Sequence, residues 1–219
     1  VLWFANNKED AHEEPTIKRS RSHDYVSKEV INVRENVGLI EVANFSKHEF
    51  KGPDARKFLD HIMAGRLPKP GRISLSPMLS YRGKLCGDLT VACLDENEFM
   101  VFGSGAAQEM HRRWFESHLD KFNLSYSNRS DEYHGLSIAG PNSRKVLEKI
   151  VRDDVSNEKF KFRDSRRMFV GGVPAIINRI SFTGELGYEI YVAPHYQLKL
   201  YEELMEAGKE FNIKPFGGR

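Results

Sequence analysis

The sequence has few of the residues that build metal centres and disulfide frameworks. Only two cysteines occur, Cys86 and Cys93, and neither belongs to a CxxC pair or has a histidine at ligand spacing. The eight histidines form no HxH or HExxH motif, the patterns that supply zinc ligands in many hydrolases. The sequence therefore predicts no metal site, and reduced thiols in place of a disulfide framework.

Long hydrophobic runs are also absent. No stretch reaches the roughly 18 apolar residues of a membrane-spanning helix. The N-terminal segment Val1-Leu2-Trp3-Phe4 is followed by charged residues, which is unlike the apolar core of a signal peptide. We expect a cytoplasmic location, or the mitochondrial matrix if the protein is eukaryotic, and no membrane partner.

A strong net charge is missing as well. The 33 basic and 31 acidic residues leave a formal charge of +2, so the chain lacks the positive field of a nucleic-acid-binding protein. The segment Gly103-Ser-Gly105 follows an expected strand and opens an expected helix, but the third glycine of a dinucleotide-binding motif is absent. Nothing resembles a nucleophile elbow around a serine. We expect neither nucleic acid nor a nucleotide as a partner of this chain.

What the chain does contain is enough apolar material for a folded core. It has 219 residues, 40% of them hydrophobic. Residues 1–25 lack apolar periodicity and are predicted to form an N-terminal arm or linker, with the folded domain at 26–219. Because the chain begins without methionine and stops at Phe216-Gly-Gly-Arg219 directly after a helical pattern, we expect it to be a piece of a longer protein.

Short strands alternate with helices of three to four turns. The expected helices include segments around Gln108 to Phe122 and Tyr196 to Phe211. The expected strands are Gly38 to Val42, Asp88 to Leu94, Glu98 to Phe102, Gly135 to Ala139, Val173 to Phe182 and Tyr188 to Val192.

Two segments of the chain repeat. Residues 50–62 and 138–150 share the frame G-P-x-x-R-K-x-L-x-x-I, and the offset from Pro53 to Pro141 is 88 residues (141 − 53). A strand followed by a helix then recurs after about 90 residues. The order strand-helix-strand-strand-helix, found twice, predicts an α+β fold of tandem duplicated split-βαβ (ferredoxin-like) halves, at about 30–125 and 130–219. A cleft between such halves is a natural ligand site.

Each half carries one acid in an unusual place. Asp88 stands at the mouth of an apolar strand, after the turn Arg82-Gly83-Lys84, and Glu189 lies among apolar neighbours in RISFTGELGYEIYV, residues 179–192. Taken singly, Glu189 could face water on an alternating strand, and Asp88 could cap its turn. Their occurrence after similar turns in both halves favours a shared site.

Together these residues resemble the folate-binding, aminomethyltransferase-like portion of the dimethylglycine and sarcosine dehydrogenase family, which is related to the glycine-cleavage T-protein. The resemblance covers nearly the whole chain, through residues 2–4, 17–20, 37–45, 78–91, 138–141, 180–189 and 213–219. It implies tetrahydrofolate as the acceptor of a one-carbon unit and 5,10-methylenetetrahydrofolate as the product. Full-length members carry an N-terminal FAD domain that oxidises an N-methyl amine, so it also implies an FAD-binding domain of the same chain as partner; nothing in these 219 residues looks able to hold FAD.

The resemblance implies roles for four residues. Asp88 matches the family's catalytic Asp, which orients and polarises a folate nitrogen, and Glu189 matches the Glu that accepts hydrogen bonds from the pterin edge. Arg219 matches an Arg that contacts folate. Phe182 stands at a cofactor-binding position where the T-protein pattern usually has Tyr, so one hydroxyl is missing there.

Two other functions remain open at this point. One is a T-protein-like aminomethyl or methyl transferase that uses another donor. The other is a non-catalytic regulatory relative, against which the presence of both Asp88 and Glu189 argues.

Overall fold

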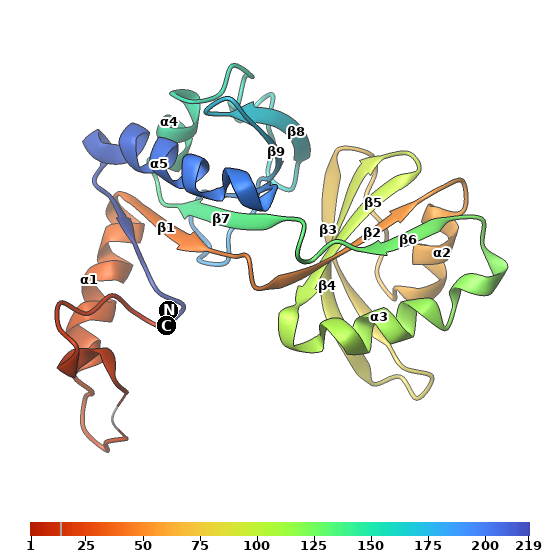
Figure 1. Ribbon diagram of the computed structural model, residues 1–219, viewed down its shortest axis with the longest axis horizontal. Coiled ribbons are helices and arrows are strands. Elements are labelled where there is room, and N and C mark those ends of the chain that lie inside the picture. Colours follow the sequence, from red (N-terminus) through yellow and green to blue (C-terminus); the bar gives the residue numbers. More distant parts are fainter. Residues whose placement is uncertain (14) are drawn as a thin grey trace.

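The computed structural model describes residues 1–13 and 15–219, and it contains two β-sheets that lie side by side in Figure 1. The six-stranded sheet consists of β1 (Val37–Glu41), β7 (His134–Ala139), β8 (Ser165–Val170), β9 (Val173–Asn178), β10 (Gly187–Val192) and β11 (Ile213–Pro215). The five-stranded sheet consists of β2 (Phe45–Lys51), β3 (Arg72–Leu79), β4 (Leu85–Asp95), β5 (Glu98–Ser104) and β6 (Ser125–Asn128). Neighbouring strands run antiparallel apart from the β1–β11 pair.

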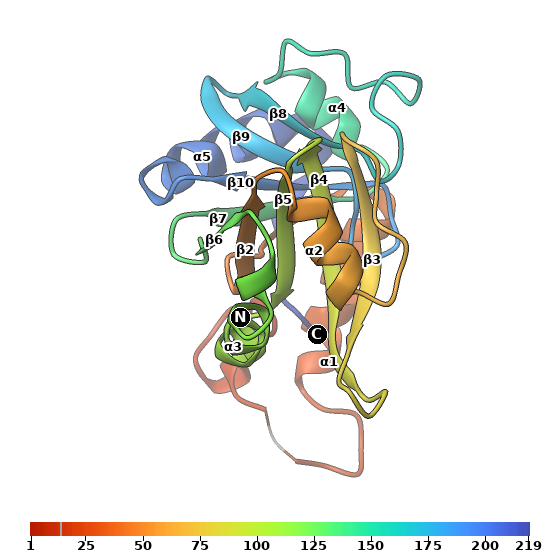
Figure 2. The same ribbon diagram turned by 90° about the vertical axis from the view of Figure 1, so that its right-hand side faces the viewer.

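Helices cover the outer face of each sheet. They are α2 (Ala55–Ile62) and α3 (Gln108–Glu116) on the five-stranded sheet, and α4 (Ser143–Glu148) and α5 (Gln197–Gly208) on the six-stranded sheet. Helix α1 (Ser22–Glu35) lies instead beside β1 and β11, at the edge of the six-stranded sheet. Short 3-10 helices lie at Glu9–Ala11, Gly105–Ala107, Leu119–Lys121, Pro194–Tyr196 and Lys209–Phe211. Figure 2 shows α2 in front of the five-stranded sheet. No helix in the described part of the chain is both long and apolar enough to span a membrane.

The duplication predicted from the sequence is confirmed by the order of the elements. The series β2-α2-β3-β4-β5-α3-β6 and β7-α4-β8-β9-β10-α5-β11 correspond one to one. Their strands are also arranged alike, as β3-β4-β5-β2-β6 and β8-β9-β10-β7-β11, with β1 inserted between β7 and β11. Each unit is therefore a ferredoxin-like βαββαβ motif with one extra edge strand, β3 or β8.

Strand β1 belongs to the sheet of the second unit, although it precedes the first unit in the sequence. It pairs there with β7 and β11. The chain therefore passes from the sheet of the second unit into the first unit directly after β1, so that this linker ties the two units together in addition to their side-chain contacts.

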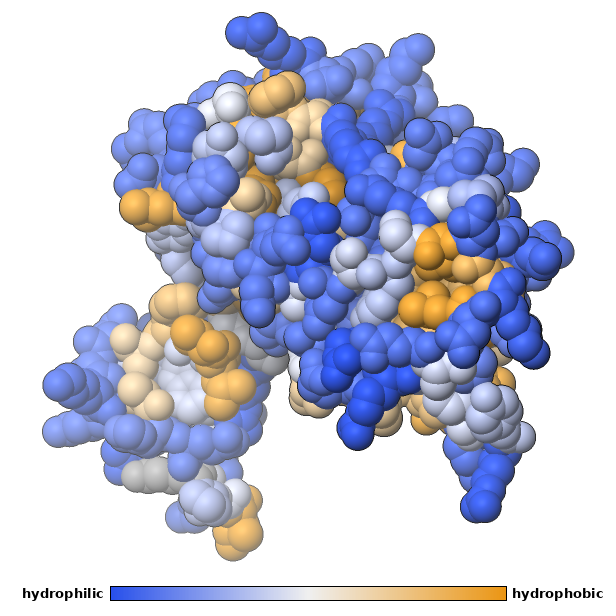
Figure 3. Space-filling model, turned by 45° about the vertical axis from the view of Figure 1, so that its right-hand side comes forward, coloured by the Kyte–Doolittle hydropathy of each residue, from blue (hydrophilic) through white to orange (hydrophobic). Residues whose placement is uncertain are grey.

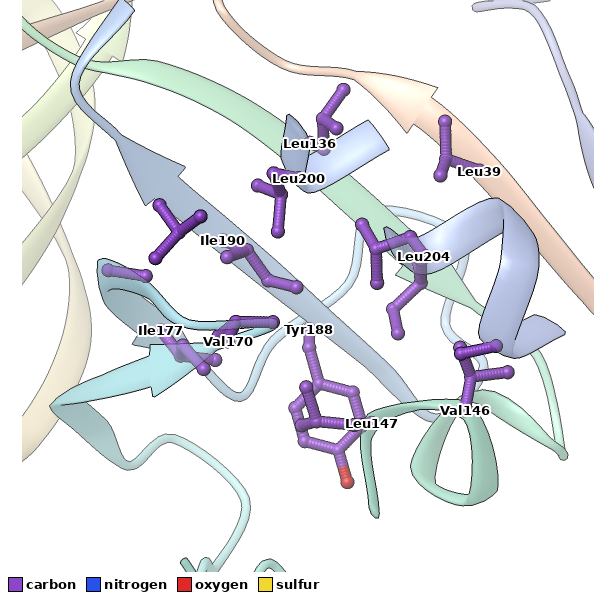
Figure 4. Close-up of a cluster of buried hydrophobic side chains, with 14 of the residues drawn as sticks. Leu39, Leu136, Val146, Leu147, Val170, Ile177, Tyr188, Ile190, Leu200 and Leu204 are labelled. Atoms are coloured by element: carbon purple, nitrogen blue, oxygen red, sulfur yellow. The ribbon is translucent and has the colours of Figure 1, made fainter. Parts of the chain in front are cut away.

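Three apolar clusters fill the molecule. Inward-facing residues of β10, such as Tyr188 and Ile190, pack with Leu200 and Leu204 of α5 in the cluster drawn in Figure 4. A second cluster lies between the five-stranded sheet and its helices, with Phe50, Phe58 and Phe115 fully buried. The third, which we call the inter-sheet cluster, joins the two remaining sheet faces; it consists of Val42, Ile73, Ala92, Met100, Phe102, Ile176 and Tyr191.

The two largest differences from the expected boundaries are at the ends of β9 and α3. The strand predicted for Val173 to Phe182 ends at Asn178, because the next residues turn away from the sheet into a loop that Ser181 closes by donating its hydroxyl hydrogen to the carbonyl oxygen of Glu185. The helix expected to reach Phe122 ends at Glu116. Its apolar continuation forms the 3-10 turn at Leu119–Lys121 instead.

The N-terminal segment packs on the opposite end of the chain. Helix α1 begins at Ser22, within the predicted arm. The Glu29 carboxylate on α1 accepts hydrogen bonds from the backbone N–H groups of Phe4 (2.7 Å) and Gly217 (2.9 Å). The two termini therefore lie next to each other, as Figure 1 and Figure 2 show. In Figure 3 the arm and α1 form a lobe with apolar patches, set off from the main body by a hollow.

Candidate functional site

A cavity of about 1040 Å³ opens at the β1 edge of the six-stranded sheet. Its walls come from α1, β1, β7, β10, α5 and both chain termini. Leu39 and Leu136 line it on the helix-covered face, whereas Ile40, Ser137 and Glu189 line it on the inter-sheet face. The cavity thus wraps around the sheet edge beyond the short strand β11, and its volume is at the upper end of the range for small-molecule sites.

Glu189 lies in the middle of β10 and is 8% exposed. It belongs to a polar row that crosses the sheet, since its register partners are Asn178 on β9 and Ser137 on β7, both buried. The amide nitrogen of Asn178 has no hydrogen-bond partner among the described residues. Of this row, Ser137 and Glu189 line the cavity, while Asn178 lies behind Glu189 and is fully buried. A carboxylate at a mostly apolar cavity can fix the orientation of a ligand.

The environment of Glu189 alters its protonation. Burial raises the pKa of its carboxyl to about 7, while the hydrogen bond from the Tyr191 hydroxyl (2.9 Å) acts in the opposite direction. No other hydrogen bond or ion pair to the Glu189 side chain is found in residues 1–13 and 15–219. The second carboxylate oxygen, Oε1, is therefore left for a ligand, and the group changes charge near neutral pH.

Tyr191 was not predicted as a site residue. It is 1% exposed, and its ring packs against Phe102 of the five-stranded sheet with 4.6 Å between ring centroids. The buried Lys47 lies on the same ring, with its Nζ 6.0 Å from the centroid. The available signal was the spacing of two, which places Tyr191 and Glu189 on one face of a strand.

Lys47 fastens the junction between the two sheets. Its ammonium donates to the carbonyl oxygens of Ala43 (2.7 Å) and Ser130 (3.5 Å), which belong to the two linkers between the halves. Burial lowers its pKa to about 8, and the nearby carboxylates of Asp131 and Glu41 oppose that shift. We interpret Lys47 as a structural tie between the linkers.

Phe182 and Arg219 line the same cavity as Glu189. Phe182 is 95% exposed on the loop after β9, so its ring is free to pack on a ligand. Arg219 forms an ion pair with Glu13, and its guanidinium lies 5.8 Å from the centre of the Trp3 ring. Since the Arg219–Glu13 pair is exposed, it holds the guanidinium only weakly.

Asp88 lies apart from the other three predicted residues. It is exposed on β4 opposite Pro77, and it does not line the cavity. No hydrogen bond or ion pair to its carboxylate occurs within the described residues, so it does not cap its turn. It does share a strand face with Thr90 and Ala92, and Ala92 belongs to the inter-sheet cluster. Asp88 therefore faces the side on which the six-stranded sheet presents Glu189.

Metal ligands do not gather at this site. No group of three or more His, Cys, Asp or Glu side chains able to hold an ion is found in the part of the chain that the structure describes.

A family model described as the GCVT N-terminal domain matches residues 1–219. The chain belongs to this family. The resemblance stated from the sequence is thereby confirmed, and the domain is aminomethyltransferase-like.

The curated relatives of this GCVT domain are enzymes. Mitochondrial dimethylglycine dehydrogenase of Mus musculus is 35% identical over 218 residues, which cover 98% of this chain and 25% of the relative. Sarcosine oxidase subunit alpha of Rhizobium meliloti is 32% identical, covering 99% of this chain and 22% of the relative. Aminomethyltransferase of Thermoanaerobacter pseudethanolicus is 30% identical, covering 84% and 50%. The chain spans about a quarter of the length of the dehydrogenase and half that of the transferase.

Solved structures identify the fold. The glycine cleavage system aminomethyltransferase T from Bartonella henselae superposes with a TM-score of 0.77 at 22% identity, covering 88% of this chain and 51% of that one. A chain of the heterotetrameric sarcosine oxidase from Corynebacterium sp. U-96 gives a TM-score of 0.65 at 19% identity, covering 91% and 98%. The GCVT domain described here therefore has the T-protein fold.

Proposed function

We propose that this GCVT domain transfers a one-carbon unit to tetrahydrofolate, giving 5,10-methylenetetrahydrofolate. The observation that carries the proposal is the buried Glu189, whose Oε1 is unpaired among the described residues at a large, mostly apolar cavity. A carboxylate in such a place needs a partner that supplies hydrogen-bond donors and tolerates apolar walls.

A pterin meets both requirements. Its edge presents a ring N–H and an adjacent amino group, two parallel donors that a carboxylate can accept together. The flat ring suits the apolar walls, and the exposed Phe182 at the same cavity can stack on it. The glutamyl tail of folate is anionic, which suits the guanidinium of Arg219 on the cavity wall.

Asp88 is proposed as the acid that handles the reacting centre. Its carboxylate is exposed and unpaired within the described residues, and it lies on the sheet face directed toward the six-stranded sheet. A carboxylate at that place can accept the proton of a folate nitrogen and stabilise the passing iminium charge.

The donor is proposed to be an N-methyl amine such as dimethylglycine or sarcosine. Relatives that this chain matches over at least 98% of its length are named for those two compounds. The amine would be oxidised by an FAD-binding domain of the same chain, and the flavin supplies the oxidation that forms the iminium. In a eukaryote the location would be the mitochondrial matrix, since the matching dehydrogenases are named mitochondrial.

The aminomethyltransferases among the relatives favour one alternative. In that case the same folate site would accept an aminomethyl-derived or methyl unit from another donor. A flavin-reduction assay with dimethylglycine and sarcosine on the full-length protein separates the two donors.

Calorimetric titration of tetrahydrofolate under anaerobic conditions tests the folate site. At pH 8.5, where Glu189 is mostly ionised, Glu189→Gln should weaken binding by about 2 to 4 kcal/mol, because one acceptor oxygen becomes a donor facing the ligand's donor. The matched control is Glu185→Gln, at the same cavity, which should bind as wild type does. Equal affinities of wild type and Glu189→Gln, or no binding by wild type, would contradict the proposal.

A further inference from the structure

The hydroxyl of Tyr191 makes the one hydrogen bond to the Glu189 side chain found in residues 1–13 and 15–219. The two residues are separated by a single position on β10, and both side chains leave the same face of the strand. The bond, 2.9 Å long, ends on Oε2. It therefore leaves Oε1 of Glu189 facing the cavity.

The ring of Tyr191 is held in place from both halves of the fold. Phe102, from the five-stranded sheet, packs on it at 4.6 Å. Across the six-stranded sheet its register partner is Gly135, where an added Cβ would come within 2.7 Å of the ring. Because the ring lies over this glycine and under Phe102, the hydroxyl has no room to turn away from Glu189.

We propose that Tyr191 is a positioning residue for the folate site, which fixes Glu189 through Oε2 and keeps it in the ionised form that accepts the pterin edge. The inference rests on the proposed function. It adds that Tyr191 connects the packing between the two halves to ligand binding at Glu189.

The chemistry follows from what each form of the acid offers a pterin. A protonated Glu189 carries an O–H donor that opposes the ligand's donors, so binding requires the acid to lose its proton. A hydrogen bond donated to a carboxylate favours the charged form, and here it opposes the effect of burial on the pKa of Glu189. Without Tyr191 the acid should ionise at higher pH, and folate binding should move with it.

Other charged side chains surround the site, and they are the same in wild type and in the Tyr191 variant. One lies on the Tyr191 ring and the rest line the cavity: Lys47, Glu29, Arg34, Glu41, Glu185 and Arg219. None of them is changed by a substitution at Tyr191, so their titration cancels when affinities are expressed as a ratio of wild type to variant.

The test is the pH dependence of tetrahydrofolate affinity in wild type and Tyr191→Phe. A hydrogen bond to a charged group corresponds to about one pH unit in the ionisation of Glu189. Wild type should then bind about tenfold more tightly at pH 6, and about equally at pH 9. Loss of packing alone would give the same ratio at every pH.

The matched control is Tyr188→Phe. Tyr188 is also fully buried on β10, but its side chain points into the opposite core beneath α5, as Figure 4 shows. Its removal should leave the wild-type pH profile of folate binding unchanged.

A second measurement does not depend on folate. In ligand-free protein labelled with ¹³C at the glutamate carboxyls, the Glu189 signal is assigned by its loss in Glu189→Gln. Its titration midpoint should rise by about one pH unit in Tyr191→Phe. If that variant fails to fold, Gly135→Ala takes its place, because the added methyl displaces the ring while the hydroxyl is retained.

The outcomes separate the two proposals. An unchanged Glu189 midpoint, or an affinity ratio that is the same at pH 6 and pH 9, overturns the role of Tyr191. A shifted midpoint in a protein that binds no tetrahydrofolate at any pH supports the role of Tyr191 on the carboxyl and refutes the proposed function.

Discussion

Replacing Glu189 by Gln should stabilise the folded protein, and more so as the pH rises. An acid with an ordinary pKa of 4.5 in the unfolded chain and about 7 in the folded protein keeps its proton more tightly when folded. Folding is therefore penalised once the unfolded chain can release that proton. The penalty is absent well below pH 4.5, grows between pH 4.5 and 7, and is complete above pH 7.

The size of the effect follows from the shift. A shift of about 2.5 pH units corresponds to about 3.4 kcal/mol at 1.36 kcal/mol per unit, of which about 2.5 kcal/mol develops between pH 5 and pH 8. Glutamine cannot ionise and escapes this penalty while keeping a carbonyl oxygen for the Tyr191 hydroxyl. The gain in unfolding free energy of Glu189→Gln over wild type should thus increase by about 2.5 kcal/mol over that range.

Urea unfolding at pH 5, 6, 7 and 8, followed by tryptophan fluorescence and circular dichroism, measures this difference. The control Glu185→Gln changes a half-buried acid at the same cavity that pairs loosely with Arg34 at 3.8 Å, and its difference from wild type should stay flat. A flat difference for Glu189→Gln as well would refute the reasoning, since it would mean that burial does not perturb this acid.

Three further predictions concern other groups. In the full-length protein, Asp88→Asn should lower the rate of 5,10-methylenetetrahydrofolate formation by about 100-fold or more, while flavin reduction and folate affinity persist. The control is Asp95→Asn, at the other end of β4. An unchanged product yield in Asp88→Asn would count against the assignment. Burial, aided by the neighbouring His111, lowers the pKa of His48 from 6.5 to about 4, so His48→Gln should gain about 3 kcal/mol of stability relative to wild type as the pH falls from 6.5 to 4, with the exposed His12→Gln as the control. The 219-residue chain alone should bind no FAD and reduce no dye with dimethylglycine or sarcosine. Amine-dependent dye reduction by this chain would contradict the proposal that a separate FAD-binding domain oxidises the amine.

The duplicated fold was predictable because each copy of the repeat contains the same short motif of neighbouring residues. The two G-P-x-x-R-K frames recur where the same strand-to-helix turn recurs, ahead of α2 and α4. The place of β1 in the sheet of the second unit was not predictable. Its apolar residues Val37 and Leu39 would suit the core of either sheet, and the pairing with β7 is decided by the linkers, which no periodicity encodes.

The site was predictable in part. Sequence resemblance selected Glu189, Phe182 and Arg219, which line one cavity although 37 residues separate Phe182 from Arg219 (219 − 182). It selected Asp88 too, which lies on another sheet outside that cavity. What it could not supply was the burial of Glu189, because its neighbour Tyr191 packs on Phe102 of the other half, a contact between residues far apart in the sequence.

The inter-sheet cluster connects the two acids that we propose for the site. Phe102 and Ala92 of the five-stranded sheet share this cluster with Tyr191 of the six-stranded sheet, so the contact that holds Glu189 is also the contact that fixes one half against the other. Asp88 lies on the same face of β4 as Ala92, four residues before it in the strand. A substitution that loosens the Phe102–Tyr191 contact would therefore disturb both the ionisation of Glu189 and its position relative to Asp88. The proposed one-carbon transfer needs its ligand held at one end and its reacting nitrogen polarised at the other. The duplicated fold would then supply one proposed acid from each half, and the packed interface between the halves would set the spacing between them.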